Sequence, residues 1–324
     1  MSTSIGVLEE VLEDLKAQRT FRLSAAWRPK GSAALVVPVI RTGSRPRAYL
    51  TIQEAKSVEI LDTGDIGRVQ VRNGEKLPVF VRVGSLLEGK GTQSRAVNKS
   101  VTIGSGETVD VGVNCVHHSH GIDPSASFEA VTGHLAPASV ERHLVGANQG
   151  GVWAAVAHYN ASKQAMGGGT NSLGQTDNLV GEFNTTDRFT AMVDRLVKEI
   201  PNHEGQVGVV VFDDRGVYGM EVFDSPDSWR VFNSAVVEKF GELLVGRLDE
   251  RILDVRVRED KVAESVASFL DQLKESCIGP EGSGDPEKVQ FGGRYCGEVS
   301  FHASEFVHLT AVRGEESAEA TELA

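Results

Sequence analysis

Short strand-like segments separated by turn residues fill the first part of the chain, and they restrict its possible folds more than any other feature. Apolar or alternating residues bounded by Gly, Asn, Asp and Ser occur at 33–41, 48–52, 68–72, 78–83, 97–103 and 108–116. Because no helical period separates them, these segments favour strands that pair antiparallel. Strict alternation in the last segment places Val109, Val111, Val113 and Cys115 on one face, so we expect Cys115 in the core.

Helical periods dominate later in the chain, after a first amphipathic helix at 5–18. Helices are expected around 149–159, at 186–200, from Pro226 onward behind the capping residue Ser225, and at 259–275. A hairpin with Gly216 in its turn is expected at 207–223, and two or three strands follow up to about residue 312. The sequence therefore predicts an α+β fold, largely antiparallel, with a β-rich first half, a helix-rich second half and a C-terminal return to strands.

These patterns also predict how the chain is divided. We expect an N-terminal helix and lead-in over 1–29 and a domain over 30–312, with possible subdomains at 30–135 and 136–312. The stretch 313–324 is acidic and lacks an apolar period, which is typical of a solvated tail.

Charge and cysteine content limit the classes of partner. The net charge of −12, from 45 acidic and 33 basic residues, repels polyanions, so nucleic acid is not expected as a partner. No apolar run approaches the roughly 20 residues that cross a bilayer, and the start of the chain lacks the pattern of a signal peptide. Three cysteines do not resemble a disulfide framework. We expect a cytoplasmic protein without a membrane partner, and self-association stays open.

The segment CVHHSH, residues 115–120, gathers a thiol and imidazoles, which are ligands that zinc prefers. On a strand, however, His117 shares the face of Cys115 while His118 points away. Cys277 and Cys296 have no His or Cys at the spacing of zinc ligands. We therefore expect no structural zinc, and acid/base chemistry or a polar strand end are the other interpretations of this segment.

A second polar stretch lies in the glycine-containing segment 84–100. Its charged and amide residues are Glu88, Lys90, Gln93, Arg95, Asn98 and Lys99. Arginine offers a planar fork to a carboxylate or phosphate, and Gln and Asn offer paired donors and acceptors, so the segment is a candidate anion site. The alternative is a structural loop in which Arg95 and Asn98 bind backbone carbonyls. If 97–103 and 108–116 form a hairpin through 104–107, Arg95 lies close to the end of the strand at Cys115 and His117.

Several of these motifs resemble the ARPP family, the proteins associated with ADP-ribosylglycohydrolase (ARG) and with rhodanese and phosphatase superfamilies. The motifs are LPVFVRVGSLLEGKGTQSRAVNKS and the strand ending in NCV, followed by QGGVWAAVA, the hairpin VGVVVF…GVYGMEVF with DSPDSW, SFLDQL and VHLTAV. The resemblance covers roughly 30–312. Gln93, Arg95 and Asn98 match the family's Q-N-R-x-x-N, and Cys115 matches its C-V-E, with His117 in place of the glutamate.

The resemblance implies a link to ADP-ribose chemistry but carries no established reaction. The first hypothesis is a protein that binds or processes an ADP-ribose-like, nucleotide or other phosphorylated small molecule. Its ligand-binding residues would be Lys90, Gln93, Arg95 and Asn98, and its proton-transfer residues His117 and Glu88. The second hypothesis is a non-enzymatic scaffold or assembly protein in which the polar loop is structural. The sequence names no cofactor.

Overall fold

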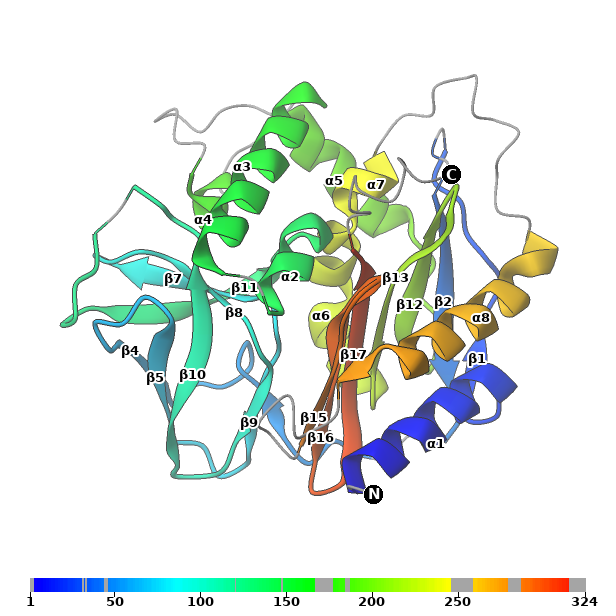
Figure 1. The fold of residues 1–324 in the computed structure, drawn as a ribbon, viewed down its shortest axis with the longest axis horizontal. Coiled ribbons are helices and arrows are strands. Elements are labelled where there is room, and N and C mark those ends of the chain that lie inside the picture. The colour runs from blue at the N-terminus through cyan, green and yellow to red at the C-terminus, as the bar shows by residue number, and fades with distance from the viewer. Residues whose placement is uncertain are drawn as a thin grey trace.

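A computed structural model describes most of the chain. The described residues are 3–30, 32, 34–43, 46–119, 121–146, 148–166, 177–183, 187–245, 259–278 and 287–314. Figure 1 shows a barrel on one side, a large sheet on the other, and helices between and around them. The expected acidic tail lies outside the described residues from 315 onward.

The barrel is closed by antiparallel strands from the first part of the chain, in the order β10-β5-β4-β11-β7-β8. Their bounds are β4 (Val58–Asp62), β5 (Arg68–Asn73), β7 (Ser85–Lys90), β8 (Arg95–Val97), β10 (Thr108–Cys115) and β11 (Ser127–Leu135). Successive side chains of each strand point alternately into the barrel and out of it. In β5 the buried residues are Val69, Val71 and Asn73, and the exposed ones lie between them. Val111 and Val113 of β10 fill the same interior.

A small sheet of β3 (Leu50–Thr51), β6 (Val79–Val81) and β9 (Val101–Ile103) shares its apolar core with the barrel. The predicted continuous strand at 97–103 is wrong, because the chain leaves the barrel between β8 and β9. Two hydrogen bonds hold Ser100 at the point where the chain leaves the barrel. Its N–H donates to Glu298 Oε1 (2.9 Å), and its hydroxyl accepts from Val83 N–H (2.8 Å). β10 therefore pairs with β8, and β9 pairs with β6.

The large sheet is antiparallel throughout, in the order β1-β2-β12-β13-β17-β16-β15-β14. Its strands are β1 (Phe21–Leu23), β2 (Leu35–Arg41), β12 (Gln206–Asp213), β13 (Gly216–Phe223), β14 (Cys277–Ile278), β15 (Lys288–Phe291), β16 (Tyr295–His302) and β17 (Glu305–Arg313). The predicted hairpin is β12 and β13, and Gly216 has the positive φ of 110° that its turn requires. β2, from the first half of the chain, pairs with β12.

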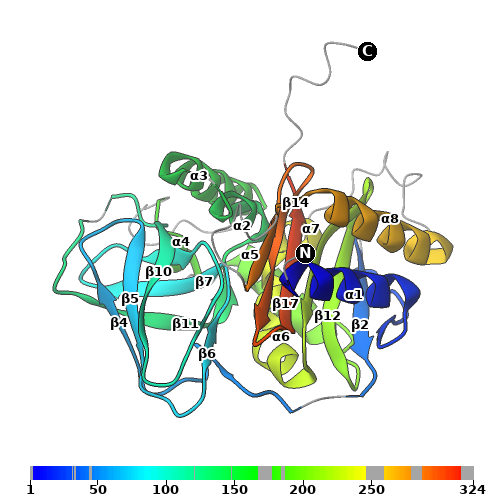
Figure 2. The same ribbon diagram turned by 60° about the horizontal axis from the view of Figure 1, so that its bottom comes forward.

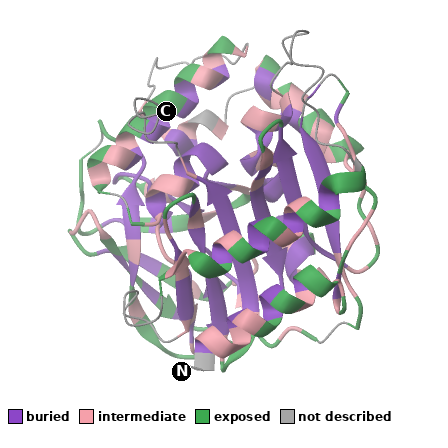
Figure 3. Cartoon of the chain, turned by 45° about the vertical axis from the view of Figure 1, so that its right-hand side comes forward, coloured by how far each residue is buried: buried purple, intermediate pink, exposed green. Residues whose placement is uncertain are grey.

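Helices cover both faces of this sheet. α1 (Thr3–Ala17) and α8 (Val262–Glu275) lie on one face, where their apolar residues join those of the strands in a single core (Figures 2 and 3). α6 (Pro226–Lys239) lies on the other face, with α5 (Arg188–Glu199) and α7 (Gly241–Val245) packed beside it. Ser225 caps α6 as expected, because its side chain accepts from Ser228 N–H.

α2 (Ala138–Leu144), α3 (Gln149–Ala165) and α4 (Leu179–Phe183) pack on the barrel through a core that includes Ala96 of β8. The α+β class and the antiparallel pairing are thus confirmed. The helix-rich second half is wrong, because β12 to β17 all come from that half and helices are interspersed among strands. Among the described helices, none is long and apolar enough to cross a membrane.

Candidate functional site

One end of the barrel brings together the polar segment and the cysteine that carried the family resemblance. β8 and β10 pair antiparallel with Arg95 directly opposite Cys115. The expected proximity of these two stretches is therefore confirmed, and the register of the pairing is centred on the predicted turn at 104–107, although β9 leaves this pairing to join β6. β7 pairs on the other side, with Leu87 opposite Arg95. Directly paired residues share a face, so Arg95, Cys115 and Leu87 all point into the barrel.

Arg95 is fully buried, with 0% of its surface exposed, and lies in strand β8. Its Nη1 donates to the backbone oxygen of Gln93 (2.9 Å) and to Gln93 Oε1 (3.1 Å). Its Nε and Nη2 are also sealed from solvent, and neither donates a hydrogen bond to any described residue. The guanidinium lies over the Phe128 ring, 5.7 Å from its centroid.

Asp62 is the carboxylate nearest to Arg95, and its side chain is fully buried too. The Oδ2 atom of Asp62 lies 3.9 Å from Arg95 Nη2, which is too long for a hydrogen bond. That oxygen accepts from Thr92 Oγ1 (2.8 Å), and Oδ1 accepts from Gly64 N–H (2.9 Å). Burial lowers the pKa of Arg95, while Cys115 and Asp62 act in the opposite direction. The barrel end therefore holds a guanidinium whose charge is only partly compensated.

The strand end at Cys115 is closed by a side chain that sequence reasoning missed. Gln149, the first residue of α3, accepts from Cys115 N–H at Oε1 (2.9 Å) and donates from Nε2 to Cys115 O (2.7 Å). The Cys115 thiol donates to His117 O (3.3 Å), and its sulfur accepts from His117 N–H (3.4 Å). The signal for Gln149 was its place in the QGGVW motif, but nothing local paired that motif with Cys115.

The connection between β7 and β8 lies against the buried pair, because Gln93 contacts Arg95 and Thr92 contacts Asp62. It needs glycine at position 89, where a Cβ would lie 2.3 Å from Thr92 O. The connection between β10 and β11 is joined to this one, because Asp123 N–H donates to Thr92 Oγ1 (3.1 Å). Thr92 thus links Asp62 inside the barrel to Asp123 outside it.

Glu88 and Lys90 are not part of the buried cluster. Leu87 points inward, so the alternating positions 88 and 90 face the outside of the barrel. Lys90 Nζ forms ion pairs there with Glu88 (2.7 Å) and with Glu129 of β11 (3.2 Å). The structure therefore places the predicted Glu88 and Lys90 on the opposite side of the wall from Arg95.

Asn98 also lies away from the guanidinium. Its Nδ2 donates to Asn114 Oδ1 (3.0 Å), and Asn114 alternates with the inward-facing Val113 and Cys115. His117 is half-buried just beyond Cys115, where its backbone bridges Asn178. Of the predicted residues, Gln93 and Arg95 lie together beside His117, while Glu88, Lys90 and Asn98 lie elsewhere.

Two further residues of metal-ligand type that follow the CVHHSH segment, Asp123 and His134, lie apart from it in their contacts. His134 Nδ1 lies 2.5 Å from Glu238 Oε2, and its ring stacks on Phe183. Asp123 accepts from Ser125 N–H within its own turn (2.9 Å). In the ranges that the structure describes, no three His, Cys, Asp or Glu residues are grouped as metal ligands, and His120 lies outside those ranges.

A second polar cluster, which sequence reasoning missed, joins the barrel to the large sheet. We call it the interface network; its members are Arg82, Glu141, Glu221, Lys239, His308 and Thr310. Arg82 contacts Glu221 Oε2 (2.7 Å) and Glu141 Oε2 (2.8 Å), and Lys239 Nζ lies 2.7 Å from each of the same two glutamates. All are buried, so the network fixes α2 and α6 between the two β structures.

Burial and neighbouring charges shift the pKa values of Glu221 and His308 in the interface network. Burial alone would raise the pKa of Glu221, but Arg82, Lys239 and His308 together hold it well below its ordinary value. Burial lowers the pKa of His308, so this imidazole is neutral near pH 7. The signal in the sequence was a charge at a core position of an apolar strand, as in VFVRV, because such residues are rarely buried unpaired.

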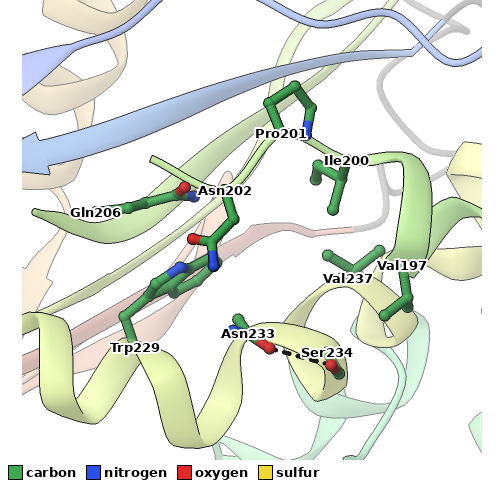
Figure 4. A pocket seen from close by; sticks show the side chains of 9 residues that line it. All are labelled: Val197, Ile200, Pro201, Asn202, Gln206, Trp229, Asn233, Ser234 and Val237. Carbon is green, nitrogen blue, oxygen red and sulfur yellow. Dashed lines mark hydrogen bonds between the residues drawn. The ribbon is translucent and has the colours of Figure 1, made fainter. Parts of the chain in front are cut away.

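A separate cavity of about 70 Å³ lies beside α6 (Figure 4). α5, the connection to β12 and α6 provide its lining: Val197, Ile200, Pro201, Asn202, Gln206, Trp229, Asn233, Ser234 and Val237. This cavity includes none of the residues that carried the family resemblance at Gln93 to Cys115. The barrel end is therefore the candidate site.

The family model ARPP-1, described as the ARG and Rhodanese-Phosphatase-superfamily-associated Protein domain, matches residues 30–312. No curated protein and no solved structure matches the chain.

Proposed function

We propose that this chain, which belongs to the ARPP-1 family, binds a small anionic ligand at the barrel end, with Arg95 as its anchor. The ligand class is a phosphorylated small molecule such as a nucleotide or an ADP-ribose-like compound. One observation carries the proposal: Arg95 is fully buried, yet among the described residues only its Nη1 donates to oxygen acceptors, and the Cys115 thiol and Asp62 are the other groups that act on its charge.

The physical reason lies in the cost of a buried charge. Arginine stays ionised in proteins and has five N–H donors. Burying such a group costs free energy unless its charge is paired and its donors are satisfied. Asp62 is 3.9 Å away, and both of its oxygens already accept hydrogen bonds. A phosphate would match the fork of the guanidinium and supply the acceptors that Asp62 does not.

Access to Arg95 requires a local opening. Its Nε and Nη2 are sealed in this conformation, and the nearby connections are joined where Asp123 N–H donates to Thr92 Oγ1. We therefore expect binding to separate these two residues. Gln93 would keep Arg95 Nη1 in place, because its backbone and side-chain oxygens both hold that nitrogen.

Binding is better supported than processing. Glu88 faces the outside of the barrel and is paired with Lys90, so it is separated from Arg95 by the wall. His117 is the predicted proton-transfer residue nearest to the cluster, because it follows Cys115 by two positions. His117 can transfer a proton only to a ligand that extends from Arg95 to this strand end.

Calorimetric titration with ADP-ribose, AMP and inorganic phosphate tests the proposal. The informative variant is the double substitution Asp62→Asn with Arg95→Met, because it removes both charges and avoids leaving a carboxylate buried alone. Lys90→Met is the matched control on the outer wall. We expect binding by the wild type and by the control, and no binding by the double variant. Absence of binding by the folded wild type would refute the proposal.

The second candidate is a non-enzymatic assembly protein in which Arg95 is purely structural. It is favoured by the bond from Arg95 Nη1 to the backbone oxygen of Gln93, which is what a structural arginine forms. In that case the double variant changes stability alone, and the wild type gives no heat with any of the three anions.

A further inference from the structure

We infer that a cavity between the end of β2 and the β16–β17 hairpin binds a small zwitterion of the free amino acid class. The cavity has a volume of about 290 Å³ and lies on the large sheet, outside the barrel-end site. It is lined by Arg41, Pro46, Ala48, Tyr49, Asp224, His302, Glu305, Phe306 and Val307.

Asp224 provides a fixed carboxylate. Its Oδ1 accepts from the Tyr49 hydroxyl (2.7 Å) and from the Ser228 hydroxyl (3.2 Å). Burial raises the pKa of Tyr49 well above its ordinary value, so this phenol stays protonated and donates. Asp224 lines the cavity, and none of the described residues donates a hydrogen bond to its Oδ2. One carboxylate oxygen is therefore held, and the other is free to accept.

Arg41 provides the opposite charge. Its Nη1 donates to the backbone oxygen of Asp224, and its guanidinium lies 5.2 Å from the centroid of the Phe21 ring. Arg41 lines the cavity, and none of the described residues accepts a hydrogen bond from its Nη2. No ion pair joins the Arg41 guanidinium to the Asp224 carboxylate in this part of the structure, although Arg41 contacts the backbone of that residue.

Neighbouring side chains position the Tyr49 phenol that holds Asp224. Arg47 forms an ion pair with Glu54 (2.7 Å) and lies over the Tyr49 ring, 5.4 Å from its centroid, which keeps the Tyr49 phenol against Asp224. Burial raises the pKa of Asp224, while Tyr49, Ser228, Arg41 and Arg47 act in the opposite direction. The cavity thus has an acceptor and a donor of opposite charge beside the apolar side chains of Phe306 and Val307, and His302 and Glu305 also line it.

A free amino acid matches this arrangement because its ammonium can donate to Asp224 Oδ2 and its carboxylate can accept from Arg41 Nη2. Its side chain would then lie along Phe306 and Val307. A ligand with one charge would satisfy one of the two groups and bring a like charge to the other, which disfavours it. The two opposite charges therefore select for a zwitterion over a simple anion or cation.

Calorimetric titration with the free amino acids tests the inference, and N-acetylated and C-amidated forms of the best ligand serve as chemical controls. We expect an amino acid with an apolar side chain to bind, and each blocked form to lose at least about tenfold in affinity, which corresponds to about 1.4 kcal/mol. Arg41→Met and Asp224→Asn should produce losses of the same order. Arg22→Met, on the exposed face of β1, is the matched control.

The outcome is independent of the barrel-end proposal, because Arg41→Met should leave any binding of ADP-ribose or phosphate unchanged. Two results would overturn the inference. The first is that no free amino acid binds to folded wild-type protein, and the second is that the blocked forms bind as well as the free one.

Discussion

Arg95 and Cys115 lie directly opposite each other on neighbouring strands of the barrel, and both side chains point into its interior. The pair places a buried cation beside a buried thiol at the barrel end, where Asp62 is the nearest carboxylate. This packing should affect the free energy of unfolding and the reactivity of the Cys115 thiol, and both can be measured without a ligand.

Replacing Arg95 alone with methionine should destabilise the protein by about 3–5 kcal/mol, because it leaves Asp62 buried without a counter-charge. The double variant with Asp62→Asn should recover a large part of that loss. Chemical denaturation of the two variants and the wild type measures the difference. A loss below about 0.5 kcal/mol for Arg95→Met, the range of ordinary surface substitutions, would contradict the buried position.

Glu221→Gln should cost about 3–5 kcal/mol of unfolding free energy, because Arg82 and Lys239 lose a shared partner inside the interface network. The control is Glu88→Gln, which removes one exposed ion pair with Lys90 and should cost no more than about 1 kcal/mol. Equal costs for the two variants would show that the network contributes nothing beyond a surface pair.

Stability should fall on acidification, beginning below about pH 6.5, the ordinary value for histidine. The folded-state pKa of His308 is lowered, so the unfolded chain binds a proton more readily, and the stability present above pH 6.5 is lost as the pH falls toward the folded value. Glu221 and Glu141, whose pKa values are also lowered, extend the loss below pH 4.5.

Denaturant titrations between pH 7.5 and 5.5 test this dependence. A His308→Gln variant lacks the titrating imidazole, and its stability should vary less with pH over that interval than the stability of the wild type. A variant that keeps the full slope would assign the effect to other groups.

Cysteine alkylation in the native state should spare Cys115, which has 0% exposure, until denaturant is added. Cys277 should react slowly at pH 8, because burial raises the pKa of its thiol to about 11 and the thiolate is the reactive form. Mass spectrometry after timed exposure to iodoacetamide reports each site. Rapid stoichiometric labelling of Cys115 in native protein would contradict the closed barrel end.

Local signals explain which elements could be predicted. The hairpin of β12 and β13 and the start of α6 at Pro226 carry their turn and cap residues within a few positions. β4, β7 and β11 were missed, because strands such as Ser85–Lys90 combine apolar residues with exposed charges and are completed by pairing across the barrel. These strands form only when the barrel closes, and the sequence of a single segment does not show that closure.

The candidate site was predictable only in part for the same reason. The proximity of Arg95 to Cys115 followed from two strands close in sequence. The burial of Arg95 depends on Asp62 and Phe128, which come from other strands of the barrel. The interface network likewise joins Arg82 to Glu221, 139 positions apart. Charges at core positions were a signal of such pairing, but not of the partner's identity.

Nitrogen NMR of the arginine side chains during titration with ADP-ribose tests the central claim most directly. The Nε–H signal of Arg95, assigned by its loss in the double variant with Asp62→Asn, should shift as the ligand saturates the protein, since that donor gains an acceptor. A titration in which ADP-ribose and phosphate leave the Arg95 signal unchanged, at concentrations where the folded protein would be saturated, would contradict the account.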